Sequence, residues 1–291
     1  KNNTIFCILK IKNKSTIIMN TEIKLINLNM SLNDFKIIYY WEYIHRMLAR
    51  IIGLFFIFPL IYFHYTKKIN KKYIFISYVI FLLILFQGIV GWFMVKSGLI
   101  HNVSVSHYRL SIHLIIAITI ISSIFWLILN IKNQENKIFF KFKKKYIPYL
   151  ILIFLIYLQI IFGAFVSGLD AGNIYQTWPL MGFSYFPNDL IIENYKNIFN
   201  FDVHSLVQFY HRNLAYLITI YIIFLSVHIY RRGLKKLFNP MKILLFFLIF
   251  QIILGILTLV SGLNIYLASA HQISSVVLVF SAINLYFYRT K

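Results

Sequence analysis

Seven long apolar blocks constrain the fold of this chain more than any other feature. Each block is roughly 20 residues long, the length that an α-helix needs to cross a hydrocarbon core about 30 Å thick. In lipid, backbone polar groups are satisfied only within helices or closed barrels, and continuous blocks of this length indicate helices. The sequence therefore predicts an all-α polytopic membrane protein. The predicted spans are residues 43–66, 73–95, 107–130, 146–167, 204–230, 241–262 and 266–288.

Charged residues are distributed unevenly between the loops. Lysine and arginine gather at 67–72, 132–145 and 231–242 and at the C-terminus, whereas the intervening loops carry mainly aspartate and glutamate. Cytoplasmic loops of membrane proteins carry such an excess of basic residues. The pattern predicts that the basic loops lie inside and that the long loop 168–203 lies outside. The formal net charge of +21 then reflects membrane topology, and we expect no nucleic-acid partner.

The chain contains an internal repeat, which is a primary clue to architecture. EYIHRMLA (42–49) matches QFYHRNLA (208–215), and the segment 86–99 matches the segment 250–263. A third copy of the second pattern lies at 158–169. Equivalent helices enter the membrane from the same side, so the repeat is parallel. It predicts two pseudo-symmetric transmembrane four-helix bundles.

The two halves differ at the N-terminus. Residues 146–291 contain four predicted helices and the outer loop 168–203, and form the second bundle. Residues 31–145 contain three clear helices and form the first bundle. Residues 1–30 are rich in Asn, Lys and Ile, are interrupted by charge, and predict neither a signal peptide nor a span. The first helix of the first bundle is therefore expected to be missing or degenerate.

Four histidines lie inside alternate predicted spans, toward the outer ends: His45, His113, His211 and His271. Ionisable residues within a membrane usually face the bundle interior and mark a function. Two facing imidazoles in a helical bundle suit the axial positions of haem iron. A structural zinc site requires four nitrogen or sulfur ligands, and no carboxylate or thiolate completes such a set here. For a single histidine, a hydrogen-bonded core role would be the simpler interpretation; for four, one haem per half is favoured.

Charged side chains next to the histidines distinguish the halves. Glu42 lies one turn before His45 on the same helical face, whereas its repeat partner is Gln208. The acid could instead offset the helix dipole and pair with Arg46. The asymmetry nevertheless favours chemistry in the first half. Arg46 and Arg212 each follow a histidine and could bind haem propionates, or extend to the membrane interface.

At these residues the sequence resembles the haem A synthase family, in its proteobacterial and mitochondrial form. The resemblance runs from about Met30 to the C-terminus. The segments that carry it are WEYIHRMLARIIGL, YRLSIHL, GLDAGNIYQTWPLM, VQFYHRNLAY and the HQ pair at 271–272. The resemblance implies an eight-helix membrane enzyme that oxidises the C8 methyl group of haem O to a formyl group. The product would be haem A for cytochrome oxidase.

The resemblance also implies a role for each site residue. His45 and His113 would bind the substrate haem, His211 and His271 would bind a haem b cofactor, and Glu42 would be the catalytic acid. The expected partners are haem O and haem A, membrane lipid, an external electron donor, haem O synthase and cytochrome oxidase assembly factors. The expected location is the bacterial cell membrane or the mitochondrial inner membrane.

Two other functions remain open on the residues alone. A di-haem b-type membrane electron carrier would use both histidine pairs alike and would not depend on Glu42. A degenerate, non-catalytic haem-binding protein would keep the second bundle and lack an active first one. Extraction of pigments from membranes that make haem O separates these functions from haem A synthesis.

Overall fold

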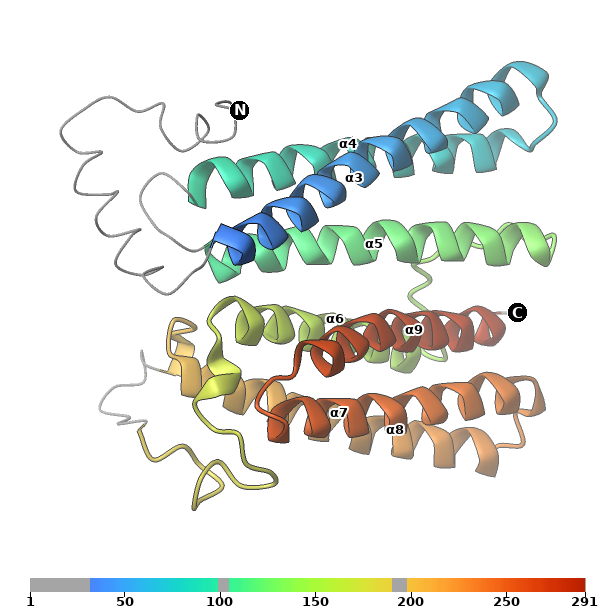
Figure 1. The fold of residues 1–291 in the computed structure, drawn as a ribbon. Helices are drawn as coiled ribbons and strands as arrows, with labels where there is room; N and C mark the ends of the chain where they lie inside the picture. The colour runs from blue at the N-terminus through green and yellow to red at the C-terminus, as the bar shows by residue number, and fades with distance from the viewer. Residues whose placement is uncertain (1–31, 99–104, 190–197, 291) are drawn as a thin grey trace.

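The computed structural model describes residues 32–98, 105–189 and 198–290 of the 291-residue chain. Within these ranges seven helices are long and apolar enough to cross a membrane (Figure 1). They are α3 (Leu32–Thr66), α4 (Lys71–Gly98), α5 (His107–Lys132), α6 (Ile147–Gly168), α7 (His204–Arg231), α8 (Phe238–Val260) and α9 (Ile265–Arg289). Each predicted span corresponds to one of these helices, so the prediction of a polytopic all-α chain is confirmed.

Local sequence determines where several helices begin and end. Pro148 lies in the first turn of α6, where its missing N–H costs no hydrogen bond. Asn264 caps α9, because its side chain accepts hydrogen bonds from the backbone N–H groups of Tyr266 and Leu267. Basic residues end α5 and α9, at Lys132 and Arg289, where they interact favourably with the helix dipole.

The helices of the second half form a closed ring of contacts. α6 contacts α7, α7 contacts α8, α8 contacts α9, and α9 returns to α6. α5 packs on both α6 and α9, α4 packs on α5, and α3 packs on α4. Figure 1 shows α5 between the α3–α4 pair and the four helices of the second half.

The buried core is concentrated in helices α5 to α9. Its main cluster draws on α5 to α9 and includes the fully buried Leu152, Ile222, Leu244 and Ile283. No member of that cluster among the described residues comes from α3 or α4. Only 6% of the most apolar stretch of each of these two helices is buried, against 22–33% in the other five. The first half therefore exposes most of its apolar surface to the surroundings, which in a membrane are lipid.

The starts of α3, α5, α7 and α9 lie at one end of the molecule, together with the loop between α6 and α7 (Figure 1). This end carries the histidines identified from the sequence. Residues 1–30, to which the prediction of a missing or degenerate first helix applies, lie outside the described residues. The arrangement in two four-helix bundles remains a prediction.

Candidate functional site

The four predicted histidines form two pairs in space. His45 of α3 lies near His113 of α5, and His211 of α7 lies near His271 of α9. The last three lie within about two turns of the starts of their helices. The structure thus brings together the two histidines of each half, as the sequence predicted.

Two histidines of the second half are held by glutamines of the preceding helices. Gln159 of α6 donates from Nε2 to the backbone carbonyl of His211 at 3.0 Å, and the same nitrogen lies 3.2 Å from the ring Nδ1. Gln251 of α8 donates to the carbonyl of His271 at 3.0 Å and lies 3.4 Å from the ring Nε2. Each amide therefore contacts both the backbone and the imidazole of its histidine.

The first half repeats this arrangement at its second histidine. Gln87 of α4 donates to the backbone carbonyl of His113 at 2.9 Å, and its Nε2 lies 3.3 Å from the ring Nε2. A carbonyl oxygen only accepts hydrogen bonds, so the atom that faces it must be the amide nitrogen. The orientation of all three glutamine amides follows from this contact.

A glycine one turn after each glutamine lies against the imidazole ring. A Cβ built on these glycines would approach the ring Cε1 to 2.9 Å at Gly91, 3.2 Å at Gly163 and 2.9 Å at Gly255. By contrast, a Cβ on Gly88 would meet no atom within 4 Å. Glycine at the three positions lets each imidazole lie directly against the neighbouring helix backbone.

The remaining polar atoms indicate what such a pair can bind. Nδ1 of His113 and Nδ1 of His271 are buried and have no hydrogen-bond partner among the described residues. A buried polar atom without a partner costs about 1–3 kcal/mol, which a ligand can recover. In the described ranges no three His, Cys, Asp or Glu side chains gather to hold a metal ion. Pairs of imidazoles instead fit an iron whose other ligands come from a macrocycle.

Glu42 and Arg46 form an ion pair on α3. Arg46 Nη1 lies 3.5 Å from Glu42 Oε2, and the side chains are 41% and 58% exposed respectively. The pairing expected as the structural alternative for Glu42 is therefore present. Glu42 also lies one turn before His45 on the same helical face. The structure is therefore compatible with ion pairing to Arg46 and with a chemical role of Glu42 beside His45.

The repeat partners of this pair have different surroundings. Gln208 is buried and donates from Nε2 to the carbonyl of Tyr175 at 2.8 Å. Arg212 donates to the carbonyls of Tyr175, Thr177 and Leu180 at 2.9, 2.9 and 3.2 Å. Arg212 thus anchors the outer loop instead of extending to the membrane interface. Its Nε is buried without a partner among the described residues, and contact with a propionate stays a prediction.

The described part of the outer loop forms a cap that packs on the second half. Thr177 Oγ1 donates to the Leu180 carbonyl and accepts the N–H of Gly182, both at 2.9 Å. A Cβ on Gly172 would lie 2.7 Å from Leu263, so the loop packs tightly on the turn between α8 and α9. Met181 is almost fully buried within the cap.

A further histidine near the site serves packing. His107 Nε2 lies 3.6 Å from Asp202 Oδ1, and its ring packs edge-on against Phe165. A Cβ on Gly168 would lie 2.8 Å from the Cβ of His107. These contacts join the start of α5 to the end of α6. Nε2 of His107 is also buried without a hydrogen-bond partner among the described residues, but it is His113 that lies near His45 of α3.

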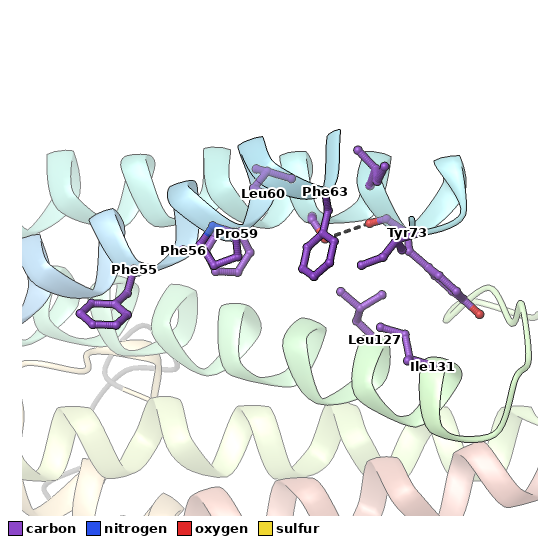
Figure 2. Close-up of a pocket in the computed structure, with 11 residues that line it drawn as sticks. Phe55, Phe56, Pro59, Leu60, Phe63, Tyr73, Leu127 and Ile131 are labelled. Carbon is purple, nitrogen blue, oxygen red and sulfur yellow. Dashed lines mark hydrogen bonds between the residues drawn. The ribbon is translucent and has the colours of Figure 1, made fainter. Parts of the chain in front are cut away.

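An apolar cavity of about 210 Å³ lies between α3, α4 and α5 (Figure 2). Its lining begins at Phe55, roughly 15 Å along α3 from His45 at the helical rise per residue. Its hydroxyl groups belong to Tyr73 and Ser77, and both already donate to backbone carbonyls. The cavity therefore offers no group arranged for metal or acid–base chemistry, and the histidine pairs remain the candidate sites.

The glutamines Gln87, Gln159 and Gln251 were absent from the predicted site residues. Their signal was present in the sequence, since each opens a Gln-x-x-x-Gly pattern on the helix that precedes a histidine-bearing helix.

Comparison with known proteins adds an independent line of evidence. Residues 12–283 match the family COX15-CtaA, described as cytochrome oxidase assembly protein. The match thus begins within the N-terminal segment, earlier than the resemblance around Met30 predicted.

Individual relatives cover most of the chain. It is 48% identical over 273 residues to "Heme A synthase" of Pelagibacter ubique (strain HTCC1062), which is 89% of this chain and 76% of that protein. It is 40% identical over 259 residues to "Heme A synthase" of Wolbachia pipientis wMel, covering 88% and 72% respectively. It is 38% identical over 266 residues to "Heme A synthase" of Rickettsia felis (strain ATCC VR-1525 / URRWXCal2), covering 90% and 78%.

Proposed function

Because the chain belongs to the COX15-CtaA family of cytochrome oxidase assembly proteins, we propose that it oxidises haem O to haem A in a membrane. The reaction converts the C8 methyl group of haem O to a formyl group, and the product serves cytochrome oxidase. Similarity to relatives named "Heme A synthase" over most of the chain is the observation that carries this function. It favours the enzyme over the electron carrier and the non-catalytic haem-binding protein.

His45 and His113 bind the iron of the substrate haem O in this proposal. They are imidazoles from two helices of one half, and His113 lies against Gly91 with a buried, unpartnered Nδ1. These features fit an axial ligand pair. The two residues fix the macrocycle with respect to α3, on which Glu42 lies one turn away.

His211 and His271 bind a haem b cofactor. The fit is supported by the buried, unpartnered Nδ1 of His271 and by the space that Gly163 and Gly255 leave for the imidazoles. When bound, haem b would supply one-electron transfer between the substrate half and an external redox partner. The protein side chains hold the ligands and exclude water.

Glu42 is the catalytic acid. Oxidation of a methyl group releases and returns protons, and the Glu42 carboxylate can carry a proton at Oε beside the substrate iron ligand. Arg46 orients this carboxylate through the 3.5 Å ion pair. Arg46 and Arg212 are also the proposed propionate contacts of the two haems.

The proposed architecture consists of two pseudo-symmetric four-helix bundles, one in residues 31–145 and one in 146–291. The closed ring of contacts from α6 to α9 supports the second bundle. We place the basic loops inside and the loop 168–203 outside, in a bacterial or mitochondrial inner membrane. Membrane lipid, haem O synthase and cytochrome oxidase assembly factors complete the proposed partners.

The test is haem analysis in cells that make haem O and lack their own haem A synthase. Expression of this chain should produce haem A, detected by chromatography and absorbance of extracted pigment. Glu42→Ala should leave haem O as the accumulated pigment. Accumulation of haem O alone with the unaltered chain, present in the membrane with haem b bound, would contradict the proposed activity.

A further inference from the structure

One unit of three residues recurs in adjacent helix pairs. It consists of a glutamine, a glycine one turn later and a histidine on the following helix. It joins α4 to α5, α6 to α7 and α8 to α9. The same contacts hold in a loosely packed half and in a tightly packed one, so the unit does not depend on the surrounding core.

Helix packing alone does not account for the glutamines. Oε1 of Gln87 and Oε1 of Gln159 are buried without a partner among the described residues. Leaving such an atom unpaired costs about 1–3 kcal/mol, which an apolar side chain of similar size would avoid. The amides are therefore retained for what their N–H groups do.

The amide nitrogen is fixed by one hydrogen bond and also contacts the imidazole ring. In an iron-bound neutral imidazole one ring nitrogen would bind the metal and the other would carry a proton, so the contact with the ring acts through packing and not as a second hydrogen bond. One N–H donates to the backbone carbonyl of the histidine at 2.9–3.0 Å, and the same nitrogen lies 3.2–3.4 Å from the imidazole nitrogens. Rotation about the last side-chain bond of histidine is otherwise broad. The amide limits this rotation, and the glycine on the same helix determines how closely the ring approaches the backbone. Together they set both the position and the plane of the ring.

We propose that Gln87, Gln159 and Gln251 are positioning residues that set the planes of the iron-ligating imidazoles of His113, His211 and His271. The proposal rests on the binding of haem b and haem O described above. Partners of metal-bound histidines typically orient the ring and tune the metal. In this protein the partner is a glutamine amide within the membrane: Gln87 for the substrate haem, and Gln159 and Gln251 for haem b.

The three units differ in how firmly the amide is held. Ser274 Oγ lies within hydrogen-bond distance of Gln251 Oε1 and, at 3.0 Å, of the His271 carbonyl oxygen, and its single proton can be donated to either of them. Gln87 and Gln159 lack such a contact among the described residues. The plane of His271 is therefore the most firmly fixed, and Ser274→Ala should loosen it alone.

The experiment uses the full-length protein purified with its haem b and compares Gln159→Met and Gln251→Met with the unaltered chain. Methionine keeps the volume and removes both N–H donors. Electron paramagnetic resonance of the ferric haem reports the angle between the two imidazole planes. We expect altered g values, and a 10- to 100-fold weaker retention of haem b, the range found for partners of metal ligands. Ser274→Ala should cause a smaller change.

Matched variants separate positioning from general damage. Gln272→Met replaces an exposed glutamine of α9, and Gly88→Ala places a Cβ where nothing lies within 4 Å. Both should retain the original spectrum, whereas Gly255→Ala should change it because its Cβ would meet the ring of His271 at 2.9 Å. Gln87→Met should leave the haem b spectrum unchanged and weaken binding of added haem O.

Unchanged g values and haem b retention in both Gln159→Met and Gln251→Met would overturn the proposal, as would purified protein without haem b. The positioning role and the enzyme activity can fail independently of each other. Haem b with a glutamine-dependent spectrum in membranes that make no haem A would support the positioning role and reject the activity. Haem A synthesis with glutamine-independent spectra would do the reverse.

Discussion

The two halves of the molecule carry the same histidine motif in different surroundings. In the second half, α6 to α9 close into a ring around a continuous core, and the outer loop is attached to α7 by Gln208 and Arg212. In the first half, α3 packs on α4, and the matching Glu42 and Arg46 pair with each other at the surface. The second half is closed and anchored by its loop, whereas the first half leaves its distinctive carboxylate exposed.

This difference shows that the contacts around each histidine are specified within helix pairs. The glutamine, glycine and histidine contacts of α4 and α5 match those of the second half, although α4 contributes nothing to the main core cluster among the described residues. The helices around each pair then determine how exposed its histidine is.

Replacing a histidine should have the largest effect, and a different one in each half. His271→Ala removes one axial ligand of haem b, so we expect loss of nearly all haem b absorbance and of haem A synthesis. His113→Ala should abolish haem A synthesis while haem b absorbance per protein is retained. Absorbance of purified protein and pigment extraction measure both. Loss of haem b in His113→Ala would show that the halves are not separate sites.

Glu42→Gln makes the first half resemble the second, where Gln208 occupies the matching position. We expect haem A formation to fall by about 10²- to 10⁴-fold, the usual contribution of a positioned acid–base group. Haem b content should not change, because Glu42 lies on α3 away from the second pair. The rate of haem A formation in membranes supplied with haem O is the measurement. A rate within a few-fold of the original would remove Glu42 from the chemistry.

Arg212→Met and Arg46→Met compare the two matching arginines. Arg212→Met deletes hydrogen bonds to three loop carbonyls, and hydrogen bonds of charged groups contribute about 1.5–3 kcal/mol. We expect cleavage of the outer loop by added protease to rise by roughly tenfold or more, since about 1.4 kcal/mol is a factor of ten. Arg46→Met removes an exposed pair of about 0–1 kcal/mol and should leave loop cleavage unchanged. Equal cleavage in both variants would mean that Arg212 does not anchor the loop.

The smallest effect concerns the pH dependence of the outer loop, which only the second half has among the described residues. The Tyr175 hydroxyl donates to Asp189 Oδ1 at 2.6 Å. Burial alone would raise the pKa of the Asp189 carboxyl, but this hydrogen bond helps to hold its pKa below the usual value of 3.8. The same hydrogen bond, with burial, raises the pKa of Tyr175 above its usual 10.0.

The sign of each shift defines the range over which the loop is stabilised. The Asp189 contribution is present above pH 3.8 and is lost as the pH falls through the lowered pKa. The Tyr175 contribution is present below pH 10.0 and is lost as the pH rises through the raised pKa. Protection of the loop amides from hydrogen exchange, relative to the intrinsic exchange rate at each pH, should therefore be constant near neutrality and should fall at both extremes. Tyr175→Phe should remove the alkaline fall in protection; a fall that persists would assign it to another group.

Much of the fold could be predicted from hydropathy and repetition. The seven spans follow from the length of the apolar blocks, and the histidine pairs follow from matching positions in the repeat. The start of α3 at Leu32 was harder to predict, because charges at Asp34 and Lys36 interrupt the apolar pattern without interrupting the helix. Hydropathy reports which residues lipid accepts, whereas a helix continues as long as its backbone hydrogen bonds do.

The contacts of the site were harder to predict, since they depend on side-chain direction. Arg212 was expected to bind a propionate or to reach the interface, and the folded outer loop instead presents three carbonyls to it. The role of Gln251 requires the register of α8 against α9, which places its amide beside His271. The sequence contains both residues, but only the packed helices show which atoms they meet.

The turn of residues 261–264 between α8 and α9 has a consequence for how the molecule is made. Gly262 and Leu263 adopt positive φ angles and reverse the chain at once, so the two helices form an antiparallel hairpin. Such a hairpin can enter the bilayer as one piece, with the Gln251 amide and the His271 carbonyl already satisfying each other and sparing two polar groups from lipid. His271, the last of the four histidines in the chain, would then reach the membrane already held against Gln251, before α8 and α9 pack against α6 and α7.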